Sequence, residues 1–107
     1  MGKVNENILL KVLVYSNEQE KGIALYERIV LKAKELGLAG VTVVKGMMGF
    51  IGEDKIHRPK LASVSERLPV TIEIMDTQQN IDRLLPFIDE SIKNGLVALV
   101  PVNSLKK

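Results

Sequence analysis

The chain has 107 residues, of which 46% are hydrophobic and 26% are charged, and its formal net charge is +2. This length is typical of one compact domain, and the composition excludes a disordered or collagen-like chain. Because the sequence contains no cysteine, a disulfide scaffold, a thiolate metal site and a cysteine nucleophile are excluded as well. We therefore expect a single domain over residues 1–107.

Neither a membrane span nor a nucleic-acid surface is predicted. No apolar run approaches the roughly 18 residues that a membrane-spanning helix needs. The opening segment, "MGKVNENILLKVLVY", is interrupted by Glu6 and Lys11, unlike a signal sequence. We expect a cytoplasmic protein without direct membrane insertion. A net charge of +2 is too small to indicate a nucleic-acid partner.

The first half of the chain predicts a strand, a helix and a second strand. Residues 8–15, "ILLKVLVY", are mostly apolar and rich in β-branched residues, as in a strand. After a polar turn at residues 16–21, apolar residues recur at helical spacing over residues 26–36, and Gly37 stands where a left-handed C-terminal cap belongs. Residues 39–46, "AGVTVVKG", predict the second strand.

The second half predicts a strand, a helix and a last strand. Apolar and polar residues alternate over residues 68–76, as in a strand with one buried face. Asp76 and Gln79 form the pattern of a capping box, and a helical apolar stripe follows over residues 81–92. Asn94-Gly95 directly follows this stripe and indicates a helix cap rather than a hairpin turn. Residues 96–102, "LVALVPV", predict the last strand, which Pro101 marks as an edge strand or as near its end.

The element order is therefore β-α-β-β-α-β. Two β-α-β units with right-handed crossovers give one antiparallel sheet with both helices on one face, the ferredoxin-like α+β fold. The strands supply apolar residues for both faces, among them Leu9, Val12, Val41, Val43, Val97 and Leu99. Such strands are typical of a sheet that is buried on both sides. Because no third layer remains in the chain, we expect oligomerisation to cover the second face and to remove an exposed apolar patch.

The segment "KGMMGFIGEDKIHRPK", residues 45–60, interrupts this pattern. The connection at residues 47–67 is about four times as long as a normal hairpin link. Loops of this length are usually either functional or disordered, and this one is not of low complexity. Gly46, Gly49 and Gly52 recur every third residue, which permits positive φ angles and the presentation of N–H groups to a ligand. Residues 45–67 carry more cations than anions, which indicates a small anionic ligand. The cations are Lys45, Lys55, Arg58, Lys60 and Arg67, and the anions are Glu53, Asp54 and Glu66.

These features also have plainer interpretations. Glycine at every third position is often turn geometry, and the chain has neither a P-loop nor a dinucleotide-binding glycine pattern. A lone histidine such as His57 is more often a hydrogen-bonding loop residue than a base or ligand, and no second histidine is present to complete a metal site. Met47, Met48 and Phe50 fit the packing of a loop base or of a groove between subunits. We therefore predict no catalytic residue and no metal ligand.

The stretch "GLAGVTVVKGMMGFIGEDKIHRPKLASVSERLPVTIEIMD", followed by "NGLVALVPV", resembles the bacterial and archaeal family known as domain of unknown function 190. This family is a branch of the PII-like signalling proteins. The resemblance covers residues 8–102 and rests on Lys45-Gly46, Gly49-Phe50, Ile56-His57 and Leu68-Pro69. It implies the ferredoxin-like fold, a trimer, and effector sites in clefts between subunits beneath a long loop. Residues 47–67 would be the counterpart of the PII T-loop, which senses ligands and docks partners.

The sequence departs from the pattern of PII and related proteins in four places. Where PII proteins contact nucleotide phosphates through a Gly- and Lys-rich stretch, "IKNGLVALV" offers only Lys93 and Gly95, which leaves nucleotide binding open. Lys45 stands where related sequences commonly have an arginine, and Ile51 where they have a glycine. No tyrosine lies between Met47 and Arg67, so regulation by uridylylation is not expected.

The residues and the resemblance together predict a PII-like signalling protein that is not an enzyme. We expect a homotrimer that binds a small anionic effector, with a nucleotide as one candidate, and that regulates a partner protein or membrane transporter through residues 47–67. The expected ligand-binding residues are Lys45, Gly46, Gly49, Phe50, His57 and Arg58.

Other functions are weaker but stay open. A divalent-metal-binding trimer, as among the copper-tolerance relatives of PII, is weakened by the single histidine. A small enzyme would need a nucleophile–base pair or paired carboxylates, and none can be placed. RNA binding through the sheet would need exposed aromatic residues, and the strands contain only Tyr15.

Overall fold

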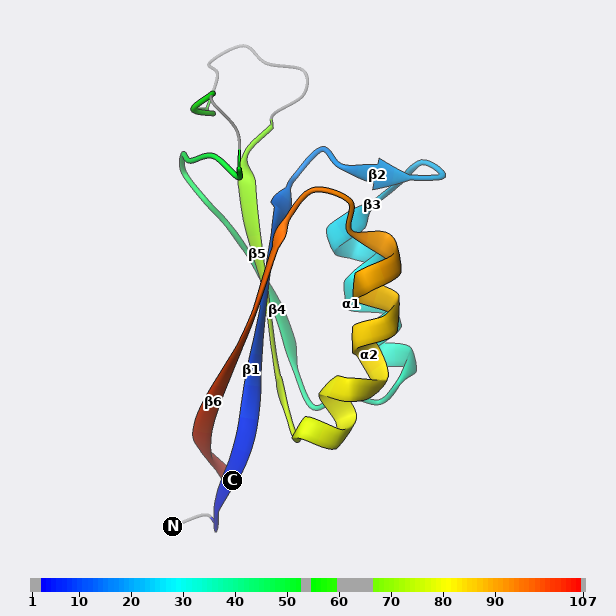
Figure 1. Ribbon diagram of the computed structural model, residues 1–107, viewed down its shortest axis with the longest axis vertical. Helices are drawn as coiled ribbons and strands as arrows, with labels where there is room; N and C mark the ends of the chain where they lie inside the picture. The colour runs from blue at the N-terminus through cyan, green and yellow to red at the C-terminus, as the bar shows by residue number, and fades with distance from the viewer. Residues whose placement is uncertain (1–2, 53–54, 60–66, 107) are drawn as a thin grey trace.

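The computed structural model describes residues 3–52, 55–59 and 67–106. Four strands form its main sheet: β1 (Lys3–Tyr15), β4 (Val41–Lys45), β5 (Pro69–Asp76) and β6 (Leu96–Lys106). The helices are α1 (Leu25–Glu35) and α2 (Gln78–Ser91), and a short ribbon of β2 (Gln19–Glu20) and β3 (Ile23–Ala24) precedes α1 (Figure 1).

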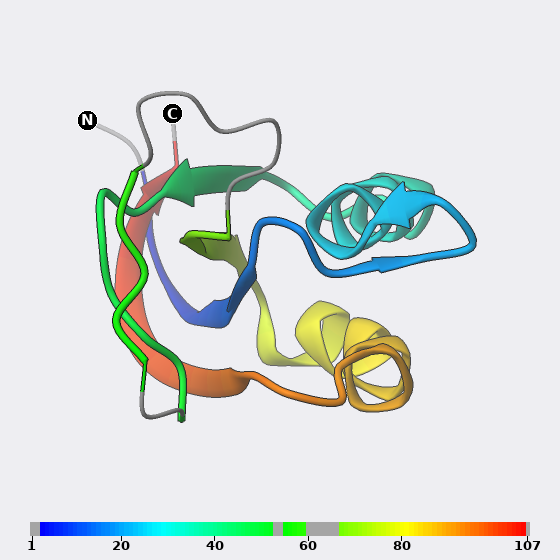
Figure 2. The same ribbon diagram turned by 90° about the horizontal axis from the view of Figure 1, so that it is seen from above.

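The strands lie in the order β4-β5-β1-β6, and every neighbouring pair is antiparallel. Helix α1 connects β1 to β4, which run parallel on either side of β5, and α2 connects β5 to β6 on either side of β1. Both helices cover the same face of the sheet (Figure 2). This confirms the predicted ferredoxin-like α+β fold with a long connection between its second and third main strands.

The core lies between the sheet and the two helices. Every second residue of the two central strands points toward the helices, and an apolar stripe on each helix packs against them. The fully buried side chains of this core include Leu10, Val12, Ile72 and Ile74 from the sheet, with Ile29, Ala33, Ile81 and Leu84 from the helices. Each large aliphatic side chain buried in this way contributes about 1.5 to 3 kcal/mol of transfer free energy.

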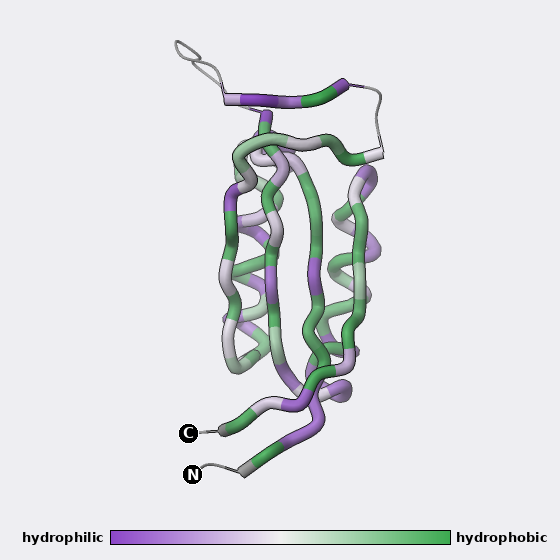
Figure 3. The backbone as a smooth tube through the Cα atoms, turned by 90° about the vertical axis from the view of Figure 1, so that its left-hand side faces the viewer, coloured by the Kyte–Doolittle hydropathy of each residue, from purple (hydrophilic) through white to green (hydrophobic). Residues whose placement is uncertain are grey.

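The opposite side of the sheet, called the open face below, points away from the helices (Figure 3). The strand register places on it Leu9, Lys11, Leu13, Thr42, Val44, Thr71, Glu73, Met75, Leu96, Ala98 and Val100. Four of its apolar side chains are strongly exposed: Val44 is 49% exposed, Met75 39%, Leu96 57% and Val100 38%. The prediction of a largely apolar second face is therefore correct for this chain.

The strand register also assigns a face to the six apolar strand residues whose face the sequence left open. Of these six residues, Leu9 alone belongs to the open face. The other five alternate with the open-face residues and point to the helix side: Val12, Val41, Val43, Val97 and Leu99. Val97 and Leu99 are nevertheless 44% and 48% exposed, because β6 is an edge strand at the end of the sheet.

The outer strands are longer than predicted. Strand β1 begins at Lys3, and β6 continues past Pro101 to Lys106 because the two strands pair along this whole length. Pro101 is tolerated within β6 because an edge strand has one side without a ladder partner. The polar turn expected at residues 16–21 holds only β2, and the β2–β3 ribbon extends beyond it to Ala24. The ribbon turns through Lys21 and Gly22 at φ angles of 54° and 80°.

The helix ends confirm one sequence prediction and correct two. Gly37 has a φ of 77°, the left-handed conformation expected after α1. The N-cap of α2 is Thr77 rather than Asp76, since the Thr77 side chain accepts a hydrogen bond from the Asn80 N–H at 3.2 Å. Gly95 is not a helix cap, because α2 already ends at Ser91. A Cβ atom on Gly95 would lie 2.8 Å from the carbonyl oxygen of Leu13, so glycine is required there by close packing.

Candidate functional site

Backbone hydrogen bonds close the base of the long loop between β4 and β5. The Gly46 N–H donates to the Pro69 carbonyl at 2.7 Å, and Gly49 and His57 exchange two bonds of 3.0 and 2.9 Å. The N–H groups of Gly46 and Gly49 are thus used within the protein and are not presented to a ligand as their spacing suggested. Gly49 and Gly52 do have positive φ angles, 155° and 58°, and a Cβ atom on Gly49 would lie 3.0 Å from the Pro69 ring.

Tyr15, the last residue of β1, joins the two arms of this loop. It is 1% exposed, and its hydroxyl accepts a hydrogen bond from the Ile51 N–H at 2.8 Å. The ring meets His57 edge-on with centroids 4.8 Å apart, and the guanidinium carbon of Arg67 lies 3.9 Å from its centroid. One buried aromatic ring therefore contacts the outgoing arm at Ile51 and the returning arm at His57 and Arg67.

We expect Tyr15→Phe to loosen the outgoing arm without unfolding the domain. The phenylalanine ring keeps the contacts with His57 and Arg67 but removes the acceptor of the Ile51 N–H, a loss of about 1 kcal/mol. Amide hydrogen exchange should therefore be accelerated at Ile51 and left unchanged at Ile72 in the core of β5. Tyr26→Phe, on helix α1, is the matched control. Equal Ile51 exchange in wild type and Tyr15→Phe would show that this bond does not hold the loop.

Two pockets of similar size open beside this cluster. The first, the loop pocket, has a volume of about 430 Å³ and is lined by Asn17, Lys55, Ile56, His57, Arg58, Pro59 and Arg67. The second, the turn pocket, has a volume of about 420 Å³ and is lined by Ile51, Gly52, Arg67, Lys93, Asn94, Gly95 and Leu96. Arg67 lines both. Among the described residues, no carboxylate lines either pocket.

The walls of these pockets are positively charged and rich in hydrogen-bond donors. Arg67 is held in place by its stacking on Tyr15 and by a hydrogen bond from its Nη1 to Asn17 Oδ1 at 2.8 Å. Lys93 lies on the turn after α2 and donates to the Glu90 carbonyl at 3.0 Å. Guanidinium and ammonium groups donate hydrogen bonds and accept none. The arrangement therefore suits an anion, which accepts hydrogen bonds and balances this charge.

The structure brings together part of the predicted site. His57 and Arg58 line the loop pocket, whereas Gly46 and Gly49 line neither pocket and only form the backbone bonds at the base of the loop. Lys45, at the end of β4, and Phe50, which is 58% exposed, line neither pocket. Five polar residues of the two pockets were not among those predicted to bind ligand: Asn17, Lys55, Arg67, Lys93 and Asn94. The signal for two of them was the excess of cations in the loop, which included Lys55 and Arg67.

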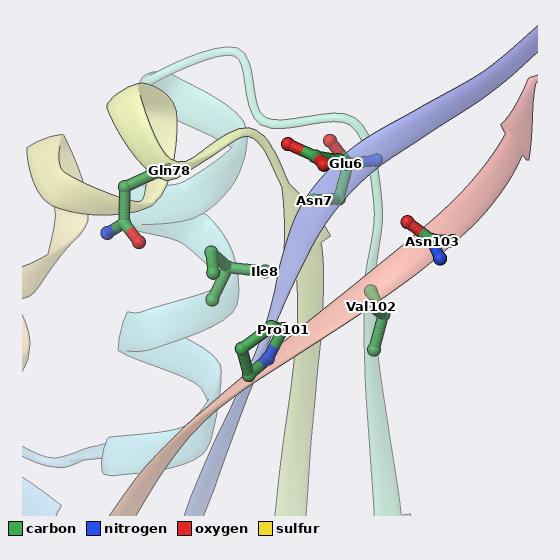
Figure 4. A pocket seen from close by; sticks show the side chains of 7 residues that line it. All are labelled: Glu6, Asn7, Ile8, Gln78, Pro101, Val102 and Asn103. Atoms are coloured by element: carbon green, nitrogen blue, oxygen red, sulfur yellow. The ribbon is translucent and has the colours of Figure 1, made fainter.

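A further pocket, of about 460 Å³, lies at the opposite end of the sheet (Figure 4). Its lining is Glu6, Asn7, Ile8, Gln78, Pro101, Val102 and Asn103. The one charged side chain in this lining is a carboxylate, so this pocket is unsuited to an anion. Within the described part of the chain, no group of three or more histidine or acidic side chains is placed to hold a metal ion. In the same residues, neither helix has the length and apolar character of a membrane span.

The sequence of the chain is similar to a known protein family and to individual relatives from other organisms. The family DUF190, described as "Uncharacterized ACR", matches residues 7–104. A UPF0166 protein of Aquifex aeolicus is 34% identical over an alignment of 103 positions that covers 94% of each chain. A UPF0166 protein of Methanocaldococcus jannaschii is 33% identical over 99 residues, covering 92% of this chain and 91% of that protein.

Among solved structures, the chain is similar to CPII, a nitrogen regulatory PII-like protein from Thiomonas intermedia K12, in its complex with ADP, AMP and bicarbonate. The TM-score is 0.69 at 15% sequence identity, and the match covers 99% of this chain and 94% of that one. At this low sequence identity, the similarity shows a shared fold and nothing more. Both comparisons confirm the resemblance found in the sequence: the chain belongs to the DUF190 family and has the fold of the PII-like proteins.

Proposed function

We propose that this protein is a PII-like regulator, not an enzyme, and that it binds a small anionic effector at the base of its long loop. The observation that carries the proposal is the placement of Arg67 between two pockets whose described linings hold cations and amides but no carboxylate. Lys55, Arg58 and Lys93 add positive charge around it. Each charge-assisted hydrogen bond that they make to an effector contributes about 1.5 to 3 kcal/mol.

Nucleotides and bicarbonate are the first effectors to consider. CPII, which shares the fold, has been crystallised with ADP, AMP and bicarbonate. The volumes of the two pockets, about 430 and 420 Å³, lie within the usual range for small-molecule sites. Lys93 and Gly95, which the sequence offers where PII proteins contact phosphates, both line the turn pocket, and this supports a phosphate-bearing ligand.

The loop is the element through which the effector would act on a partner. An anion that attracts Arg67 competes with the stacking of its guanidinium on Tyr15, which also holds Ile51. Occupancy thereby alters residues 47–67, which dock a regulated protein or membrane transporter. We further propose that the protein acts in the cytoplasm as a homotrimer, with the exposed apolar side chains of the open face buried between subunits and the effector in clefts between them.

A thermal-shift screen combined with sedimentation tests this proposal. The purified protein is heated with ADP, AMP, ATP, bicarbonate or divalent metal salts, and its mass in solution is measured by analytical ultracentrifugation. We expect a trimer, and stabilisation by at least one of the anions, which at a hundred times its Kd amounts to about 2.7 kcal/mol. A soluble monomer would contradict the assembly. Stabilisation by metals alone would contradict the anionic effector and favour the metal-binding alternative.

A further inference from the structure

Two opposite charges stand at the centre of the open face. Lys11 of β1 and Glu73 of β5 are directly opposite each other in the register, on the two central strands of the sheet. The distance from Lys11 Nζ to Glu73 Oε2 is 3.6 Å, and the side chains are 45% and 37% exposed. The neighbours in the same row are Ala98 on β6 and Thr42 on β4.

Apolar side chains surround this ion pair. Leu9 and Leu13 precede and follow Lys11 on the same face of β1, and Met75 lies opposite Leu9. Val100 and Leu96 occupy the matching positions of β6. A surface that buries these apolar side chains must therefore also take the two charges at its centre out of water.

Removing Lys11 and Glu73 from water would be costly if each side chain had only the other as its partner. A separation of 3.6 Å is longer than a hydrogen bond, so the pair lacks the close geometry with which its attraction would offset the cost of removing both groups from water. The charged groups need further donors and acceptors if the face is to be covered. A second copy of the chain supplies both, since its open face carries the same lysine and the same glutamate.

We infer that Lys11 and Glu73 determine how copies of this chain fit together through the open face, with Lys11 of one copy meeting Glu73 of the next. This inference rests on the homotrimer of the proposed function. In a cyclic assembly each copy contributes one positive and one negative group, so the charges alternate in sign around the axis and the ring closes. The apolar residues around the pair provide the affinity, and the charges select one arrangement among those that apolar contact alone allows.

Single and double replacements separate the affinity that the apolar residues provide from the choice of arrangement that the two charges make. Lys11→Met or Glu73→Leu leaves one buried charge without its opposite, and we expect trimer dissociation to become easier by about a hundredfold or more. The double variant Lys11→Met/Glu73→Leu should associate at least as tightly as wild type but as a mixture of stoichiometries. The exchanged pair Lys11→Glu/Glu73→Lys should restore the trimer. Lys32→Met is the matched control, because Lys32 forms an ion pair of 3.2 Å with Glu35 on helix α1, away from the open face.

Sedimentation equilibrium and native mass spectrometry measure these outcomes, with circular dichroism to confirm that each variant is folded. Trimers of wild-type stability in both single variants would overturn the inference, as would a double variant that is uniformly trimeric or entirely monomeric. A monomeric wild-type protein would instead contradict the proposed assembly itself. Failure of the charge-pair inference and failure of the trimer are therefore distinguished by the behaviour of the wild type.

Discussion

Replacing Asp76 with alanine is expected to lower the free energy of unfolding by about 3 kcal/mol, because three part-buried donors lose a charged acceptor. Asp76 as a whole residue is 8% exposed. It accepts hydrogen bonds from the N–H of Ala39 at 2.9 Å, from the N–H of Thr77 at 2.7 Å and from the side chain of Asn80 at 3.0 Å. One side chain thus ties the turn before β4 to the start of α2. Urea denaturation at neutral pH measures the loss.

The same carboxylate predicts a loss of stability in acid. Burial alone raises the pKa of Asp76, but the hydrogen bonds from Asn80, Thr77 and Ala39 outweigh it, so the pKa is lowered in the folded state. The resulting stabilisation is fully present above the unfolded pKa of about 3.9 and is lost as the pH falls toward the lower folded value. Asp76→Asn should flatten the pH dependence below about pH 4. Asp89→Ala, at an exposed position on α2, should change neither the free energy of unfolding nor its dependence on pH. If Asp76→Asn lost stability in acid as wild type does, Asp76 would not be the group responsible.

Replacing Arg67 with alanine is expected to weaken effector binding by about a hundredfold, since Arg67 is the charged residue common to both pockets. Arg67→Lys should restore part of the affinity, because lysine keeps the charge but loses the planar fork. Arg58→Ala removes charge from the loop pocket alone and should cost about ten- to a hundredfold.

Calorimetric titration with the anion that gives the largest thermal shift measures these affinities. Lys34→Ala, an equal change of charge on helix α1, is the control and should bind like wild type. Because Arg67 also stacks on Tyr15, Arg58→Ala provides a second variant that leaves this contact intact. Wild-type affinity in both arginine variants would place the effector elsewhere on the protein.

The order of strands and helices could be predicted from the sequence, because the spacing of apolar residues distinguishes a helix from a strand. In each helix, these residues also mark the face that is buried. The spacing of Ile81, Leu84 and Ile88, all buried in α2, is an example. Among the strands, only β5 shows a clear alternation of apolar and polar residues that marks its buried face. The faces of the other strands could not be assigned in this way, since their apolar residues fall on both sides. Val12 and Leu9 are alike in sequence, and only the register with β5 separates them.

The candidate site was predicted less well, because it is formed by contacts between distant parts of the chain. The Tyr15 hydroxyl bonds to the Ile51 N–H, 36 positions away, and no local pattern indicates this. Arg67 is brought to Asn17 and Lys93 by the fold alone. The glycine spacing suggested free N–H groups, whereas Gly46 and Gly49 form the closed base of the loop. Local charge pointed to this loop but could not identify which cations meet.

An amide NMR titration of the protein with ADP tests the central claim most directly, because it locates the ligand without any substitution. We predict that the largest shifts fall on the linings of the loop and turn pockets, at Asn17, His57, Arg58, Arg67 and Lys93. Asn7, Gln78 and Asn103 in the pocket at the opposite end of the sheet should stay unchanged. Shifts confined to that opposite pocket, or no shifts at millimolar ADP, would contradict the account of a nucleotide effector at the base of the loop.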